Sequence, residues 1–87
     1  MTQQEAEATI LEFVRKVIHP SIEVDTLLVE EGLMDSFDAV EVIDFIEEKF
    51  SLRVDPASIS REDVVSVKAM ASFAMRALAE RSAAPIE

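Results

Sequence analysis

The fold is decided in residues 35–50, which read DSFDAVEVIDFIEEKF. The apolar residues of this stretch recur at helical spacing, so they share one side of a helix, and that side should face the core. They are Ala39, Val40, Val42, Ile43, Ile46 and Phe50. Asp35 is a good N-cap, and Ser36 and Asp38 follow in the first turn, where negative charge complements the helix dipole. We therefore predict a helix that begins just after Asp35 and ends near Phe50.

Toward the N-terminus, a first helix is predicted from apolar residues at the same spacing. They are Ile10, Leu11, Phe13, Val14, Val17 and Ile18. The helix should end at His19-Pro20, because proline disfavours helical geometry in the residue before it and has no N–H to donate. A long connection, residues 21–35, leads to the second helix. Its apolar residues follow no sustained period, so we expect several of them to point inward from a surface loop. They are Ile22, Val24, Leu27, Leu28 and Leu33.

Toward the C-terminus, the sequence predicts a short third helix and a longer last one. Asp55 is the cap of the short element and Pro56 its first helical residue, and the element continues through residues 61–63 after a break at Ser60. Ser66 is the predicted cap of the last helix. That helix carries Val67, Met70, Phe73, Ala74, Ala77 and Leu78 on its apolar side. Residues 82–87 are expected to be a frayed tail.

Composition supports a small helical fold. The chain has 87 residues, of which 49% are apolar, and it contains one glycine and three prolines. This length suits one domain, residues 1–87, and the scarcity of glycine and proline argues against a turn-rich β fold. With no cysteine and a single histidine, disulfides, a cysteine nucleophile and a zinc site are not expected. The amino terminus resembles no secretion signal, and no apolar stretch could span a bilayer, so we predict a soluble, cytoplasmic monomer.

Charge is the second strong signal. The net charge is -10, and residues 30–48 hold eight of the eighteen acidic residues and no basic one. Nucleic acids and anionic membranes are therefore poor partners, whereas basic protein surfaces are suitable ones. In the second helix the acidic residues share the side opposite the apolar one; they are Asp38, Glu41, Asp44, Glu47 and Glu48. Phe37 lies on this side and Phe45 borders it. An aromatic residue among charges predicts a docking surface; the alternative is a solvated side with Phe37 folded under the preceding loop.

Several of these residues together resemble the acyl carrier proteins. The resemblance rests on Gly32-Leu33-Met34-Asp35-Ser36-Phe37-Asp38, on Val40-Glu41, on Glu47-Glu48 and on Phe50, in the family's order. It implies an all-α, four-helix bundle with a long loop between the first two helices and a short third helix. It also implies that Ser36 receives a 4'-phosphopantetheine arm from coenzyme A through a phosphopantetheinyl transferase that uses magnesium. The arm would carry an acyl or aminoacyl group as a thioester.

In the family, partner enzymes recognise the acidic second helix and the apolar residue after the serine. Those roles fall on Asp35, Phe37, Asp38, Glu41, Glu47 and Glu48. The partners would be the transferase, a loading ligase and downstream acyl-transferring enzymes of a biosynthetic pathway, and the chain would itself catalyse nothing.

Three departures from fatty-acid carriers narrow the resemblance. Gly32 lies four residues before Ser36, where those carriers usually have three, Phe37 replaces the usual leucine or isoleucine, and Asp44 occupies a position that is often apolar. The pattern is similar to discrete carriers with dedicated partners. Which group is carried, and in which pathway, does not follow from these residues.

Other functions fit less well or stay open. A serine hydrolase needs a Gly-x-Ser-x-Gly elbow and a histidine base, but Ser36 has no such glycines and His19 is alone. A calcium loop needs alternating oxygen ligands around a glycine, whereas Asp35, Asp38 and Glu41 follow helical intervals. A small acidic adaptor that binds a basic partner without a prosthetic group remains the main alternative. A phosphoserine switch at Ser36 is a variant of it.

Overall fold

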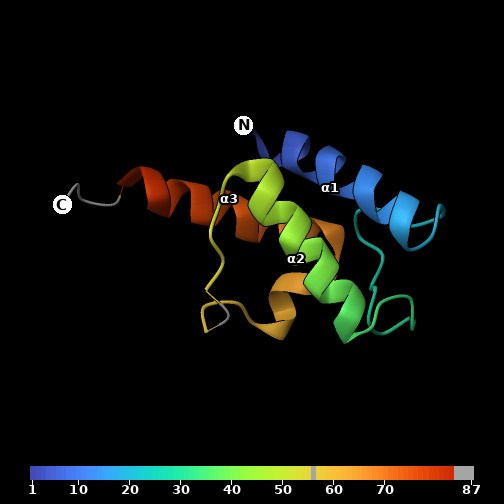
Figure 1. Ribbon diagram of the computed structural model, residues 1–87. Coiled ribbons are helices and arrows are strands. Elements are labelled where there is room, and N and C mark those ends of the chain that lie inside the picture. The colour runs from blue at the N-terminus through green and yellow to red at the C-terminus, as the bar shows by residue number, and fades with distance from the viewer. Residues whose placement is uncertain (56, 84–87) are drawn as a thin grey trace.

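The computed structural model describes residues 1–55 and 57–83. This part of the chain is all-helical and contains no strand (Figure 1). Three α-helices, α1 (Gln3–Val17), α2 (Ser36–Phe50) and α3 (Val67–Ala83), are joined by loops, and one 3-10 helix, η1 (Arg61–Val64), precedes α3. The all-α prediction is confirmed. The expected third helix is reduced to the single turn of η1, so a bundle of four full helices is not what the described residues form.

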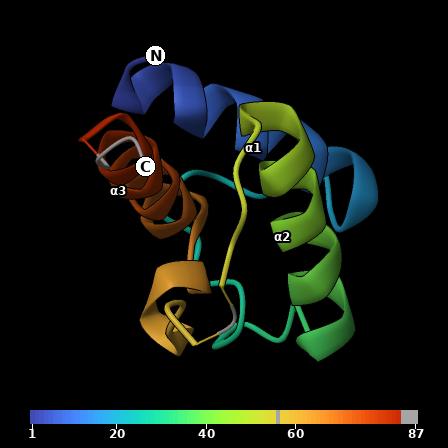
Figure 2. The same ribbon diagram turned by 60° about the vertical axis from the view of Figure 1, so that its left-hand side comes forward.

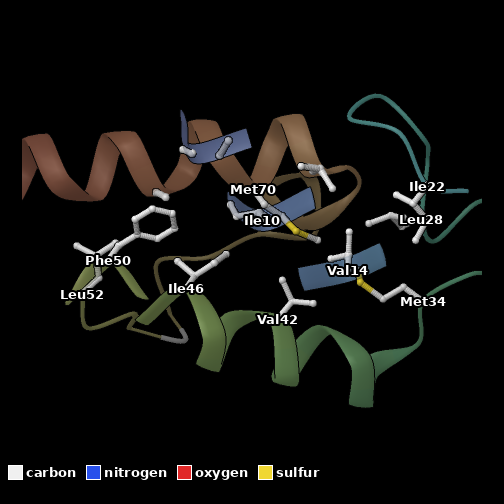
Figure 3. Close-up of a cluster of buried hydrophobic side chains, with 14 residues drawn as sticks. Ile10, Val14, Ile22, Leu28, Met34, Val42, Ile46, Phe50, Leu52 and Met70 are labelled. Carbon is white, nitrogen blue, oxygen red and sulfur yellow. The ribbon is translucent and has the colours of Figure 1, made fainter. Parts of the chain in front are cut away.

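The apolar core lies where the three α-helices converge. α1 contacts both α2 and α3 (Figures 1 and 2). The segment between α1 and α2 adds Ile22, Leu28 and Met34 to the cluster. Side chains from all three helices and from this segment point toward one another (Figure 3). The most deeply buried large residues are Ile10, Val14, Ile22, Leu28, Val42, Ile46, Val67 and Met70. Each such side chain stabilises the folded state by roughly 1.5–3 kcal/mol through the removal of apolar area from water.

Some residues predicted to face the core are exposed. The fractions of side-chain and backbone surface exposed to solvent are 44% for Val17, 42% for Leu27 and 58% for Val40. Val17 is the last residue of α1. In α2 the buried residues are four apart, at 42, 46 and 50, so the core contacts a narrower stripe than the apolar residues suggest, and Val40 falls outside it. In the loop it is Leu28, the residue after Leu27, that is fully buried.

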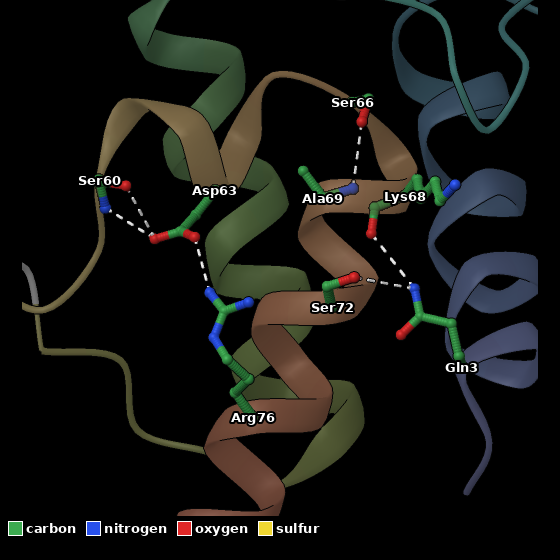
Figure 4. Close-up of polar contacts among 8 residues, drawn as sticks. All are labelled: Gln3, Ser60, Asp63, Ser66, Lys68, Ala69, Ser72 and Arg76. Carbon is green, nitrogen blue, oxygen red and sulfur yellow. Dashed lines mark hydrogen bonds and ion pairs between the residues drawn. The ribbon is translucent and has the colours of Figure 1, made fainter.

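Helix ends follow side-chain chemistry, including one signal that the sequence analysis did not use. Thr2 and Glu5 form a capping box that starts α1, and the pKa of Glu5 is lowered, first by the backbone N–H of Thr2 and then by its hydroxyl. α1 ends at Val17, slightly earlier than predicted. The predicted cap of α3 is confirmed, because the Ser66 hydroxyl accepts the N–H of Ala69 at 3.1 Å (Figure 4).

The connection before α3 is held by a small polar cluster. Asp63 accepts the N–H of Ser60 at 2.9 Å on Oδ2 and Nη2 of Arg76 at 2.8 Å on Oδ1 (Figure 4). Both contacts lower the pKa of Asp63, that of Ser60 more than that of Arg76, so the ionised carboxylate is favoured. Asp55 closes a turn through the N–H groups of residues 57 and 58, but no helix follows at residues 57–60. The predicted role of Pro56 lies outside the described residues, as do residues 84–87 of the expected tail. Residues 82 and 83 belong to α3, so the prediction of a tail beginning at residue 82 is wrong there.

Gly32 closes a single helical turn inside the long loop. Its N–H donates to the carbonyl of Val29 at 3.0 Å, and that of Leu33 donates to Leu28 at 2.8 Å. These two bonds form a Schellman motif, which needs a left-handed residue at the position of Gly32. Its φ is +71°. The loop is anchored beyond this turn by the N–H of Leu28, which donates to Val65 at 2.8 Å.

Replacing Gly32 by alanine should lower the free energy of unfolding by about 1 kcal/mol, because a Cβ is unfavourable at positive φ. A new methyl group would meet no atom within 4 Å, so the cost comes from the backbone alone. Urea unfolding followed by circular dichroism measures the change. Gly32→Asn is the matched variant and should lose less, since asparagine tolerates this conformation better. Equal stability of Gly32→Ala and the wild type would contradict the left-handed conformation of Gly32.

Among the helices of the described residues, none combines the length and the apolar character needed to cross a membrane.

Candidate functional site

Ser36 is the first residue of α2, and its side chain is exposed. The cap itself is made by its neighbour, as predicted: Asp35 Oδ1 accepts the N–H of Asp38 at 2.9 Å, and Asp38 Oδ2 accepts that of Asp35 at 3.3 Å. This reciprocal pair satisfies two of the N–H groups that a helix start leaves without partners. The Ser36 hydroxyl makes no hydrogen bond with any described residue. Capping therefore does not account for the serine.

The chain leading to Ser36 is held firmly on its inner side. Met34 is buried with 5% of its surface exposed, and Leu33 packs against the core cluster. The N–H groups of both donate to the carbonyl of Leu28, at 3.1 and 2.8 Å. These anchors fix the direction in which the chain enters α2, and the capping box fixes the first turn. Ser36 is therefore exposed on a segment whose backbone is held by hydrogen bonds on both sides.

The acidic residues of α2 differ in how free their carboxylates are. Asp44 and Glu48 are exposed, whereas Asp38, Glu41 and Glu47 are half-buried. Asp38 is bound within the capping box, and Oε2 of Glu47 accepts the backbone N–H of Val54 at 2.8 Å. We call the solvent-facing side of α2 made by Asp38, Glu41, Asp44, Glu47 and Glu48 the acidic face. Three carboxylates of the acidic face make no side-chain hydrogen bond or ion pair with the described residues. They are those of Glu41, Asp44 and Glu48.

Phe37 is the most exposed large apolar residue of the described chain, with 73% of its surface accessible. The alternative in which it folds under the preceding loop is wrong. Val40 lies one turn further along and is also exposed, which the sequence analysis missed because Val40 falls in the apolar arc of the helix. Phe37 and Val40 thus form a small exposed apolar patch beside the exposed serine.

Phe45 has a different environment. Its ring stacks on that of Phe13 in α1, with the ring centroids 4.1 Å apart and the planes 15° from parallel. Both residues are half-buried and pack against the core cluster. An offset or parallel pair of this kind strengthens helix packing by about 0.5–1.5 kcal/mol beyond area burial. Phe45 thus serves the α1–α2 contact, and sequence spacing within α2 alone could not reveal a partner on another helix.

Two other features of the described residues could carry chemistry, namely His19 and any cluster of metal-ligating side chains. His19 is exposed, and its Nδ1 lies 3.1 Å from the N–H and 2.7 Å from the hydroxyl of Ser21, two residues away. This is a local turn, and no hydrogen bond joins His19 to Ser36. Within the described ranges, no group of three histidine, cysteine, aspartate or glutamate side chains is placed to hold a metal ion.

The chain was compared with protein-family models and with curated proteins, and neither comparison found a match. A functional assignment therefore depends on the residue pattern around Ser36 and on its geometry.

Proposed function

We propose that this chain is a cytoplasmic carrier protein that bears a 4'-phosphopantetheine arm on Ser36. The observation that carries the proposal is the exposed serine hydroxyl at the start of α2, which has no structural hydrogen bond because Asp35 makes the cap. Such a hydroxyl is available to a modifying enzyme, and a phosphodiester placed there would be stabilised by the positive end of the helix dipole. The resemblance to acyl carrier proteins supplies the identity of the arm.

In the modification step, the Ser36 oxygen attacks the β-phosphate of coenzyme A. A new phosphoester bond forms, the pyrophosphate bond breaks, and 3',5'-ADP leaves. The serine proton passes to a base of the transferase, so this chain needs no activating residue of its own. The arm brings the thiol that the chain lacks, since the sequence has no cysteine, and an acyl or aminoacyl group is then carried as a thioester for a biosynthetic pathway.

Partner enzymes would dock beside the arm on α2. Asp35, Glu41, Asp44 and Glu48 provide negative charge that steers a basic surface, and the exposed Phe37 and Val40 provide apolar area next to the serine. Under this proposal residues 1–87 form one carrier domain. η1 would correspond to the short third helix of the family. The free chain acts as a monomer.

Intact-mass spectrometry tests the proposal directly. The purified chain is incubated with coenzyme A, magnesium and a broad-specificity phosphopantetheinyl transferase. We expect a mass increase of one arm on every molecule. An unchanged mass would favour the acidic adaptor, and a mass increase of one phosphate on protein isolated from cells would favour the phosphoserine switch.

Charge reversal at Asp44 and Glu48 together should slow loading of the arm by the cognate ligase roughly tenfold in kcat/KM at low salt, because steering depends on the summed charge. These positions are chosen because their carboxylates are exposed and unbonded, unlike that of Glu47.

The matched control reverses Glu12 and Glu62, which are exposed on α1 and η1 and change the net charge equally. It should load at nearly the wild-type rate. Equal slowing in both double variants would mean that net charge, and not the acidic face, governs the encounter.

A further inference from the structure

The turn that leaves α2 is organised by one residue, Glu47. Its backbone carbonyl accepts the N–H groups of Ser51 and Leu52, the latter at 2.9 Å. Its side chain accepts the N–H of Val54 at 2.8 Å. Ser51 itself has a φ of 55°, in the left-handed region that residues other than glycine rarely adopt. Three N–H donors of this reversal therefore end on Glu47, two on its backbone and one on its carboxylate.

The same turn separates two hollows. Residues 52–54 line a hollow of about 530 Å³ whose opposite wall is α3, with Phe73, Arg76 and Ala77; we call it the α2–α3 hollow. On their other side they line an open depression of about 490 Å³ together with Asp44, Glu47 and Glu48 of the acidic face. The α2–α3 hollow lies at the end of α2 remote from Ser36, roughly 20 Å along the helix at 1.5 Å per residue.

We propose that the Glu47 carboxylate couples the acidic face to the α2–α3 hollow. A guanidinium group offers two parallel N–H donors that match both oxygens of a carboxylate. Oε2 of Glu47 already accepts the N–H of Val54, so an arginine that a partner places on both carboxylate oxygens weakens that bond by drawing the carboxylate toward the guanidinium. When that N–H is released, residues 52–54 lose their side-chain tie to α2, and the wall of the hollow loosens.

Glu47 is distinguished from the other acidic residues by what it holds. The Asp38 carboxylate is bonded within its own helix turn, and those of Asp44 and Glu48 make no bond with the described residues. Glu47 is the acidic residue of this face whose carboxylate is bonded to a segment beyond α2, among the residues that the structure describes. Coupling between two sites is reciprocal. If arginine on the acidic face changes the affinity of the hollow for a ligand by some factor, that ligand changes the affinity of the acidic face for arginine by the same factor.

The inference rests on the proposed function only in requiring a basic partner, and amide hydrogen exchange of the unmodified chain tests it without coenzyme A or a transferase. In the Glu47→Ala variant, exchange of the Val54 amide should rise at least about tenfold relative to that of Met70, which lies inside α3. Glu47→Gln keeps an acceptor oxygen and should show a smaller rise. Glu48→Ala, the matched control on the next residue, should stay within about twofold of the wild type.

A tetraarginine peptide then probes the competition at low ionic strength. It should accelerate Val54 exchange by at least about threefold in the wild type, and not in Glu47→Gln, whose neutral amide does not attract a guanidinium. Three outcomes would overturn the coupling: Val54 exchange that ignores Glu47→Ala, equal acceleration of Val54 and Met70 in that variant, or a peptide that leaves wild-type Val54 exchange unchanged. Failure of the carrier function would appear separately, as an absent mass increase at Ser36.

Discussion

Ser36→Ala should abolish addition of the arm completely, while the wild type gains the mass of one arm under the same conditions. The reaction needs the serine oxygen as the attacking atom, and alanine offers none. The fold should be retained, because the hydroxyl bonds to no described residue and Asp35 supplies the cap; alanine is moreover a favourable helix residue. Intact-mass spectrometry after treatment with coenzyme A and transferase gives the result, and circular dichroism verifies the helix content.

Ser21→Ala is the control for this experiment. Ser21 is exposed, and its hydroxyl lies 2.7 Å from Nδ1 of His19, so it is a serine with a nearby base. It nevertheless lies in the loop between α1 and α2 and not at the start of a helix. The Ser21→Ala variant should accept one arm like the wild type. A modified Ser36→Ala protein, or an unmodified Ser21→Ala protein, would place the attachment elsewhere.

Val42→Ala should lower the free energy of unfolding by about 2 kcal/mol. The Val42 side chain is fully buried between α2 and the other helices, so truncation removes buried apolar area and leaves a cavity in a small core. For a domain of this size, whose total stability is on the order of 5–10 kcal/mol, that is a large fraction. Urea unfolding monitored by circular dichroism measures the shift.

Val40→Ala is an unusually close control, since the same residue type is changed two positions away on the same helix. Val40 keeps 58% of its surface exposed. Its truncation should change stability by less than about 0.5 kcal/mol, and the higher helix propensity of alanine favours a slight gain. Loading of the arm tests whether partners contact the exposed apolar patch of Phe37 and Val40. If they do, Val40→Ala should be loaded more slowly than the wild type, although its stability is nearly unchanged. Similar losses of stability in both variants would contradict the described orientation of α2.

The helices themselves were predictable because their signals are local. Asp35 begins α2 and Ser66 caps α3 as predicted, since each bonds to an N–H three residues further along the chain. The capping box of Thr2 and Glu5 was equally local and could have been found by the same rule. By contrast, the short third helix was overestimated. None of the residues of η1 is fully buried, and Val64 packs against the core cluster only in part.

Some features of the candidate site are likewise local in the sequence, and others depend on contacts with distant segments. The serine, its acidic neighbours and the glycine before them are visible in the sequence, and their resemblance to acyl carrier proteins led to the proposal of an attachment site. The exposure of Phe37 had an alternative that only the structure excluded. The roles of Phe45 and Glu47 depend on Phe13 and Val54, which lie on other segments. A helical wheel places a side chain on a face but cannot identify what lies opposite it.

Sequence alone thus determined the all-helical character, the starts of α2 and α3, and the acidic character of α2. Each depends on interactions within a few residues, which spacing and side-chain chemistry specify. Tertiary structure decided which valines of α2 are buried, which phenylalanine is exposed and which glutamate is bound to the following turn. Those properties depend on how closely α1, α3 and the loops approach α2, and helix packing selects a narrower buried stripe than the apolar pattern offers.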